Sequence, residues 1–262
     1  MLDVISYVNE RKLDIKRRVE VLTKSGHQPK MAIITDDRNF ADNASYIKSK
    51  TQFALDVGVA CDVIVMKDGD EFPNVDSYSG VIVQYPFKGL KFDDFRHYVH
   101  ANVPLDKDID GLGLYSHHKP CTPLGIVRYL EHLRNIGKLE FNVVVNIIGC
   151  GGLVGKPLAH MLMDDPRYTV CVTRWGTDEW TSDNFKASAE VIVCATDEYD
   201  LIKYTSPSKI YIDCGCALVD GKLRGNVSRD CYSEEMMITP VPNGVGRLTV
   251  LALFENLLDT II

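Results

Sequence analysis

Short apolar runs alternate with longer amphipathic segments through most of the chain. A first helix is predicted at residues 3–24, where the amphipathic pattern ends at Ser25 and Gly26. The next predicted elements are a strand at 31–35, a helix at 45–57 with Gly58 just past its end, and strands at 62–66 and 80–84. Such alternation is typical of a parallel sheet whose strands are connected by helices.

The alternation returns after a loop-rich stretch at residues 101–121. Thr122 is expected to cap a helix that has Pro123 at its first position and continues to Gly137. A continuous apolar run at 142–148 indicates a strand buried on both faces. The remaining predicted elements are a helix at 153–163, strands at 168–173, 190–195 and 209–213, a hairpin turn at Asp220 and Gly221, and a last helix at 246–261. The chain is therefore predicted to be an α/β protein with domain boundaries near residues 120 and 240.

Composition narrows the class of protein. The 262 residues carry a formal net charge of −7, which argues against nucleic acid or an anionic membrane as a general partner. No apolar run reaches the roughly 18 residues that span a membrane, and residues 1–18 lack the apolar core of a signal peptide. The eight cysteines include no Cys-x-x-Cys pair and are typical of reduced thiols in the cytoplasm. Cys214 and Cys216 form an isolated Cys-x-Cys without a second ligand pair at zinc spacing, so no metal site is predicted.

A glycine-rich run lies between the predicted strand at 142–148 and the helix that follows it. Glycines in this context permit a tight turn and let the backbone approach a pyrophosphate at the positive end of the helix. We therefore predict a dinucleotide site here, and the alternative is a turn that only packs the strand against the helix. The predicted cofactor-binding residues of the turn are Gly149, Cys150, Gly151, Gly152, Val154 and Gly155.

Arg174 follows the second strand of this dinucleotide-binding unit. An NAD site usually has Asp or Glu at this place to bind the ribose hydroxyl, whereas a cationic side chain suits the additional phosphate of NADP. Arg174 therefore favours NADP as the cofactor, with NAD as the alternative. A solvated surface arginine with no ligand is the other interpretation.

Tyr46 and Lys50 are four residues apart and share one face of a predicted helix, which Phe53 and Val57 continue. A lysine on such a face is expected to be partly buried. Desolvation lowers the pKa of a lysine and can make it a useful acid or base near neutral pH. The alternative is a lysine whose stem covers apolar surface while its ammonium group reaches water.

Several segments occur together in the order found in one family, and they cover most of the chain. They are Ser45–Lys50, Val83–Pro86, Lys107–Gly111, Pro120–Gly125, Gly149–Pro157 and Ile238–Gly246. The chain resembles the bifunctional methylenetetrahydrofolate dehydrogenase/methenyltetrahydrofolate cyclohydrolase family. The resemblance implies a discontinuous folate-binding catalytic domain at 1–120 and 241–262, a Rossmann-type NAD(P)-binding domain at 121–240, and a homodimer.

The resemblance also implies the roles of individual residues. Lys50 matches the central catalytic lysine, and Gln84 matches the glutamine beside it. Tyr46 is expected to stack on the folate and Asp110 to bind its pterin ring, so that both are catalytic and substrate-binding residues. Thr239, Pro240, Val241 and Pro242 match a loop that lines the family's active site, with Pro240 and Pro242 as substrate-binding residues.

The activity implied is NADP-dependent oxidation of 5,10-methylenetetrahydrofolate to 5,10-methenyltetrahydrofolate, followed by hydrolysis of the product to 10-formyltetrahydrofolate. The chain departs from the family's usual residues at Gln52, Cys150, Gly151, Thr196, Asn226, Asn243 and Arg247, and it is shortened at 66–80 and 111–119. A relative that keeps only one activity therefore remains an alternative. So does a folate- or nucleotide-binding protein without activity, although such a protein has no need of an unfavourable, partly buried lysine.

Overall fold

The structure is a computed structural model that describes residues 1–174, 176–215 and 217–261, and the side chain of Trp180 lies outside this description. The chain divides into two compact units. Residues 1–8 and 122–249 form the first unit, and residues 9–121 and 250–262 form the second. Helices α1 (Val4–Lys24) and α7 (Val245–Asp259) are therefore each shared between the units. Which unit carries which function stays a prediction, as do the domain limits at residues 120 and 240.

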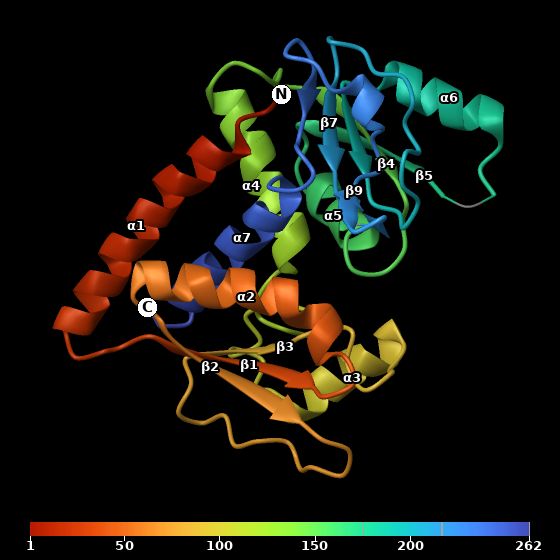
Figure 1. Cartoon of the computed structure of the whole chain (residues 1–262). Helices are drawn as coiled ribbons and strands as arrows, with labels where there is room; N and C mark the ends of the chain where they lie inside the picture. Colours follow the sequence, from red (N-terminus) through yellow and green to blue (C-terminus); the bar gives the residue numbers. More distant parts are fainter. Residues whose placement is uncertain (175, 216, 262) are drawn as a thin grey trace. The chain divides into compact units, whose positions relative to one another are not determined.

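The second unit contains a three-stranded parallel sheet in the order β2-β1-β3. The strands are β1 (Lys30–Asp36), β2 (Ala60–Met66) and β3 (Gly80–Val83). Helix α2 (Phe40–Val57) connects β1 to β2 and lies along the sheet, and α3 (Phe92–Asn102) follows β3 (Figure 1). One core cluster of this unit consists of Ala32, Ile34, Met66, Val75, Val81, Val83, Phe87, Phe95, Val99 and Val103.

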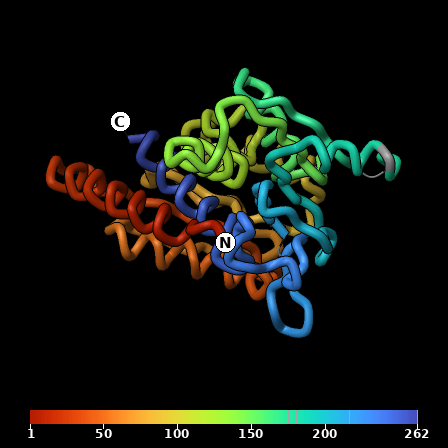
Figure 2. Tube along the Cα trace, turned by 90° about the horizontal axis from the view of Figure 1, so that it is seen from above, coloured from red at the N-terminus to blue at the C-terminus, as the bar shows by residue number. Residues whose placement is uncertain are grey.

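Helices α1, α2 and the end of α7 pack together in this unit, and Figure 2 shows them running side by side in red, orange and blue. The rings of Phe53 and Phe254 stack with their centroids 4.6 Å apart. The ammonium group of Lys12 lies 5.0 Å from the centre of the Phe53 ring. Arg11 pairs with the buried Glu255 at 2.6 Å. Ring stacking and the contact with Lys12 thus hold α2 against α7 and α1, and the Arg11–Glu255 pair holds α1 against α7. Helix α2 carries Lys50, the predicted catalytic residue.

The first unit contains a five-stranded parallel sheet in the order β10-β7-β6-β4-β5. Its strands are β4 (Val143–Ile148), β5 (Tyr168–Thr173), β6 (Val191–Cys194), β7 (Ile210–Asp213) and β10 (Met237–Ile238). The accompanying elements are α4 (Cys121–Asn135), α5 (Gly155–Met163), α6 (Glu179–Ser188), the short η1 (Arg229–Cys231) and the hairpin of β8 (Ala217–Val219) and β9 (Lys222–Arg224). A core cluster on this sheet consists of Ile148, Ala189, Ile192, Cys194, Ile202, Tyr211, Val227 and Ile238.

The predicted α/β class with parallel sheets is confirmed, and so is the hairpin at Asp220 and Gly221. The pattern predicts no helix at α3 or α6, and the helix predicted from residue 45 begins five residues earlier, at Phe40. The predicted cap at Thr122 is wrong, because α4 begins at Cys121 and the Thr122 hydroxyl bonds the Thr249 hydroxyl at 2.9 Å. Among the helices of the described residues, none combines the length and apolar character that crossing a membrane requires.

Candidate functional site

Lys50 lies on the buried face of α2. The buried residues of this helix are Asn43, Ile47, Lys50, Phe53, Ala54 and Val57, whose spacing of three or four residues forms one stripe. Lys50 is only 5% exposed, so the predicted burial is confirmed and the ammonium group does not reach water freely. A buried ammonium group is unfavourable unless nearby groups compensate its charge and hydrogen bonds.

The side chains of Gln84 and Asp110 provide that compensation. The Lys50 ammonium donates a hydrogen bond to Oε1 of Gln84 at 2.8 Å. It lies 3.6 Å from Oδ2 of Asp110, which is itself 9% exposed. The Gln84 side chain donates in turn to the Tyr85 carbonyl at 2.9 Å, so its oxygen is held toward the lysine. The structure therefore brings together Lys50, Gln84 and Asp110, three of the four residues predicted to be catalytic.

Tyr46 lies one turn before Lys50 on α2 and is 46% exposed. A half-exposed aromatic side chain one turn from a buried lysine is a residue type that can stack on a flat ligand. The buried Asn43, a further turn toward the start of α2, donates to the Pro86 carbonyl at 3.1 Å and ties the helix to the segment after β3. Sequence reasoning missed Asn43, although a polar residue in an apolar helical stripe could have indicated it.

Asp108 and Cys121 are further buried groups around Asp110. Burial raises the pKa of Asp108, an effect opposed by the hydrogen bond from the Gly113 amide and reinforced by the Asp110 carboxylate. Burial also raises the pKa of the Cys121 thiol well above its ordinary value, and Asp110 adds to this effect. The thiol donates to the Ile109 carbonyl at 3.1 Å, so Cys121 is a structural group and not a thiolate nucleophile.

The glycine-rich turn follows β4 in the first unit and leads directly into α5. A Cβ atom on Gly155 would overlap the carbonyl oxygen of Gly149, so only glycine fits at the start of this helix. The N-cap residue of α5 is Val154, whose side chain makes no capping hydrogen bond. The first backbone N–H groups of a helix are a favourable place for an anion.

The other predicted residues of this unit lie at the carboxyl ends of its strands. Arg174 directly follows β5 and is exposed, and no ion pair to its side chain occurs among the residues that the structure describes. Pro240 and Pro242 follow β10, and Pro242 is exposed with a cis peptide bond before it. Of the Cys214–Cys216 pair, Cys216 lies outside the described residues.

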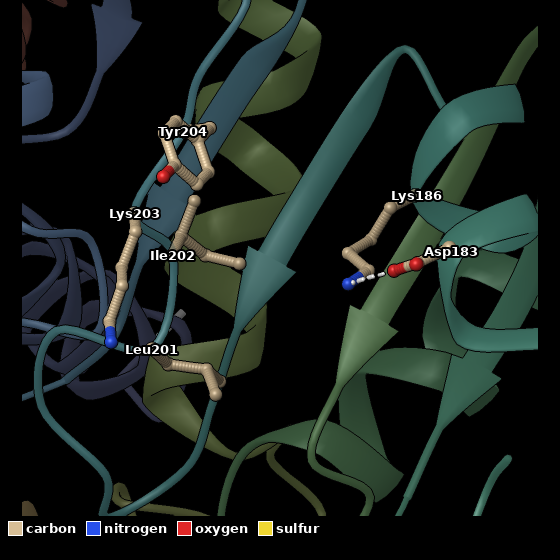
Figure 3. Close-up of a pocket in the computed structure, with 6 residues that line it drawn as sticks. All are labelled: Asp183, Lys186, Leu201, Ile202, Lys203 and Tyr204. Carbon is tan, nitrogen blue, oxygen red and sulfur yellow. Dashed lines mark ion pairs between the residues drawn. The ribbon is translucent and has the colours of Figure 1, made fainter. Parts of the chain in front are cut away.

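A surface pocket also lies on the first unit, between α6 and the segment at 201–204 (Figure 3). Figure 3 shows Lys186 and Asp183 facing each other on α6, where they form an ion pair at 2.6 Å. The lining residues are Asp183, Lys186, Leu201, Ile202, Lys203 and Tyr204. None of them is a predicted site residue, and the pocket is therefore distinct from the glycine-rich turn.

Comparison with known proteins supplies the family. Residues 120–262 match the tetrahydrofolate dehydrogenase/cyclohydrolase NAD(P)-binding domain. The bifunctional protein FolD of Malacoplasma penetrans is 31% identical, over 94% of this chain and 92% of its own length. The chain belongs to the tetrahydrofolate dehydrogenase/cyclohydrolase family. This confirms the resemblance predicted from the motifs.

Solved structures agree with this membership of the tetrahydrofolate dehydrogenase/cyclohydrolase family. The bifunctional FolD methylenetetrahydrofolate dehydrogenase/cyclohydrolase of Campylobacter jejuni superposes with a TM-score of 0.82 at 25% identity, covering 98% of this chain and 96% of that one. The FolD enzyme of Trypanosoma brucei, crystallised with NADP and an inhibitor, has a TM-score of 0.82 over 99% of this chain and 96% of that one. At 21% identity the second comparison shows the fold alone.

Two of the positions predicted to depart from the family's usual residues, Thr196 and Asn226, contact each other. The Asn226 side-chain amide donates to the carbonyl and hydroxyl of Thr196 at 3.1 and 2.9 Å, and also to the Glu198 carbonyl. A Cβ atom on Gly149 would lie 2.8 Å from Cγ2 of Thr196, so the pair lies against the glycine-rich turn. A second pair of departures is similarly joined, because Arg247 donates twice to Oδ1 of Asn243. The substitutions are thus locally consistent and leave the turn intact.

Asn226→Asp is expected to destabilise the protein by about 3 kcal/mol at pH 7, because a buried carboxylate oxygen would replace the donor and face two carbonyl oxygens. Thermal unfolding measures the loss, with Asn142→Asp at an exposed position as the matched control. At lower pH a protonated Asp regains a donor, so the deficit relative to the parent should shrink. A deficit that is absent at pH 7, or equal to that of Asn142→Asp, would contradict this account.

Proposed function

We propose that this protein oxidises 5,10-methylenetetrahydrofolate to the 5,10-methenyl form and hydrolyses that product to 10-formyltetrahydrofolate. The observation that carries the proposal is the buried contact of Lys50 with Gln84 and Asp110, in a chain that belongs to the tetrahydrofolate dehydrogenase/cyclohydrolase family. An isolated buried lysine would be unfavourable. A lysine held by an amide oxygen and a carboxylate is oriented for proton transfer.

In the oxidation, the protein's task is to orient the folate. The exposed ring of Tyr46 offers a face on which a flat cationic system can stack. The Asp110 carboxylate can accept hydrogen bonds from the N–H groups of the pterin ring. Such positioning converts binding energy into a productive arrangement of donor and acceptor, and it needs no nucleophile.

In the hydrolysis, Lys50 is proposed to move a proton. Water adds to the methenyl carbon and forms a C–O bond, and the bond from this carbon to one of its two nitrogens then breaks. One proton of the water is transferred to the released nitrogen and the other is lost to solvent. The Lys50 ammonium, held by Gln84 at 2.8 Å, can donate a proton to the released nitrogen. It can then take up a proton from the attacking water and become an ammonium again.

The glycine-rich turn fits a nicotinamide dinucleotide. Gly155 leaves no room for a side chain at the helix start, and the Val154 side chain makes no capping hydrogen bond to the N–H groups of α5, which could bind a pyrophosphate. The residues proposed to hold it are Gly149, Cys150, Gly151, Gly152, Val154, Gly155 and Arg174. A nicotinamide dinucleotide held by these residues would supply the acceptor for a hydride from the methylene carbon. We propose NADP over NAD because the exposed Arg174 stands where an NAD site has a carboxylate.

Arg174→Ser is expected to lower kcat/KM with NADP about tenfold or more, the effect of losing one charge-assisted hydrogen bond. The kcat/KM with NAD should stay within about twofold, since NAD lacks the phosphate. Steady-state oxidation with each cofactor measures this. Arg174→Lys keeps the charge and should recover part of the loss. An equal loss with both cofactors would contradict the proposed role.

The proposed function is tested by assaying the purified protein with methylenetetrahydrofolate and NADP or NAD, and separately with methenyltetrahydrofolate alone. Reduction of NADP together with hydrolysis is the expected result. Hydrolysis without reduction of either cofactor would leave a cyclohydrolase. No reaction in either assay, from protein shown to be folded by circular dichroism, would overturn the proposal.

We also propose, on the family resemblance, that the protein acts as a homodimer in the cytoplasm. Its proposed partners are tetrahydrofolate one-carbon derivatives, with neither nucleic acid nor membrane among them. The net charge of −7 supports this restriction.

A further inference from the structure

A polar residue near the end of α7 lies among apolar neighbours. Asn256 is 3% exposed and follows the buried Glu255, and the apolar residues around this pair, Phe254 and Leu257, are fully buried. A buried side-chain amide is unfavourable unless its donors are satisfied. Its two N–H groups therefore need partners inside the second unit, and the structure supplies them.

The partners are the two ends of one loop. The Asn256 side-chain nitrogen donates to the Ile109 carbonyl at 3.0 Å and to the Lys119 carbonyl at 3.2 Å. The same nitrogen lies 3.5 Å from Sγ of Cys121. The carbonyl groups at the two ends of the loop at residues 110–120 thus bind one side chain, that of Asn256 in α7. This loop contains the predicted shortened segment at 111–119.

The ends of this loop are closely packed, which leaves little freedom for their separation. A Cβ atom on Gly111 would lie 2.6 Å from both the carbonyl carbon and oxygen of Lys119. The Cys121 amide donates to the Asp110 carbonyl at 3.2 Å. Asp110 is therefore fixed by the bonds that close the loop, and its carboxylate lies 3.6 Å from the Lys50 ammonium.

We infer that Asn256 is a positioning residue that holds Asp110 at its distance from Lys50 by joining the two ends of the 110–120 loop. The inference rests on the proposed function, in which Asp110 binds the pterin ring and Lys50 transfers the proton. The hydrogen bonds that the structure describes for the Asn256 side chain go to Ile109, Lys119 and Cys121, and not to the side chain of Lys50 or Asp110. It acts through the backbone at Ile109, one residue before Asp110.

The test compares Asn256→Ala with Thr260→Val. Thr260 lies just past α7, and its hydroxyl lies 2.6 Å from the Leu257 carbonyl and 3.2 Å from the Ser79 carbonyl, so its loss removes a hydrogen bond from a side chain to a carbonyl group away from the loop. Asn256→Ala is expected to lower kcat/KM for methenyltetrahydrofolate hydrolysis about tenfold or more, with a rise in KM, because Asp110 is displaced. Thr260→Val should leave KM unchanged. A merely less stable protein would lose active molecules without a change in KM.

A second variant keeps the test decisive if Asn256→Ala does not fold. Asn256→Ser retains one donor and should show an intermediate KM. A KM equal to that of the parent in folded Asn256→Ala or Asn256→Ser, or the same change in Thr260→Val, would overturn the inference.

Hydrogen exchange separates this inference from the proposed function. The Cys121 amide should exchange about tenfold faster in Asn256→Ala than in Thr260→Val, because the bond to Asp110 opens with the loop. If the parent protein shows no hydrolysis, the proposed function fails, and this measurement alone decides whether Asn256 closes the loop. Unchanged exchange of the Cys121 amide would overturn the inference that Asn256 closes the loop.

Discussion

Lys50→Met is expected to reduce kcat for methenyltetrahydrofolate hydrolysis by about a thousandfold, the middle of the range for loss of a general acid–base group. Methionine has a similar length and suits an apolar helix face, so the packing of α2 is retained. It cannot carry a proton, and it leaves Oε1 of Gln84 without the donor that lies 2.8 Å away. Oxidation should fall less than hydrolysis, because hydride transfer depends on orientation of the folate and not on a proton from Lys50.

The matched control for this prediction is Lys48→Met, which removes an exposed lysine from the same helix. It should leave both activities within about twofold of the parent, as expected for a surface substitution. Rates are measured by the loss of methenyl absorbance and compared at a temperature where circular dichroism shows each variant to be folded. Hydrolysis by Lys50→Met within tenfold of the parent would remove Lys50 from the proposed mechanism.

Gly155→Ala is expected to lower kcat/KM for oxidation about a hundredfold, since displacement of the turn misplaces the bound dinucleotide. The added methyl group would overlap the Gly149 carbonyl oxygen and lie 3.1 Å from Cα of Cys150, so the backbone of the turn must move. We also expect a loss of about 2 kcal/mol in the free energy of unfolding from this overpacking. Hydrolysis should persist, because that step uses no dinucleotide.

Gly151→Ala provides the control for stability within the same turn. Among the residues that the structure describes, no atom beyond its chain neighbours lies within 4 Å of the position that its Cβ would occupy. Its melting temperature should therefore remain close to that of the parent, whereas that of Gly155→Ala should fall. Equal melting temperatures for the two variants, or oxidation by Gly155→Ala at the parent's rate, would contradict the importance of the close approach at Gly155.

The sequence was informative where chemistry and element type are local. Periodicity placed Lys50 on a buried helix face, and the family resemblance indicated Gln84 as its neighbour and Asp110 as a residue that binds the pterin ring. Periodicity alone could not bring these residues together, because they are 34 and 60 positions from Lys50. Their proximity comes from the tertiary packing of α2, β3 and the 110–120 loop.

The elements and contacts that were missed have physical reasons. Helix α3 has only two buried residues, Phe95 and Val99, so its helical stripe is too short to be recognised. The hydrogen bond between Asn226 and Thr196 spans 30 residues and has no local signal. Asn256 does have a local signal, because it is a polar residue within the mostly apolar sequence of α7. Nothing in the sequence says which carbonyl groups it binds.

The sharing of α1 and α7 between the two units determines how this protein can be recombined with its relatives. A chimera that exchanges the dinucleotide-binding unit must take residues 1–8 together with 122–249. All three of its junctions then fall inside helices, between Val8 and Asn9 in α1, between Cys121 and Thr122 at the start of α4, and between Thr249 and Val250 in α7. The donor sequence must continue the helical register at each of these points. Modular exchange in this fold is therefore a problem of matching helix faces and not of joining loops.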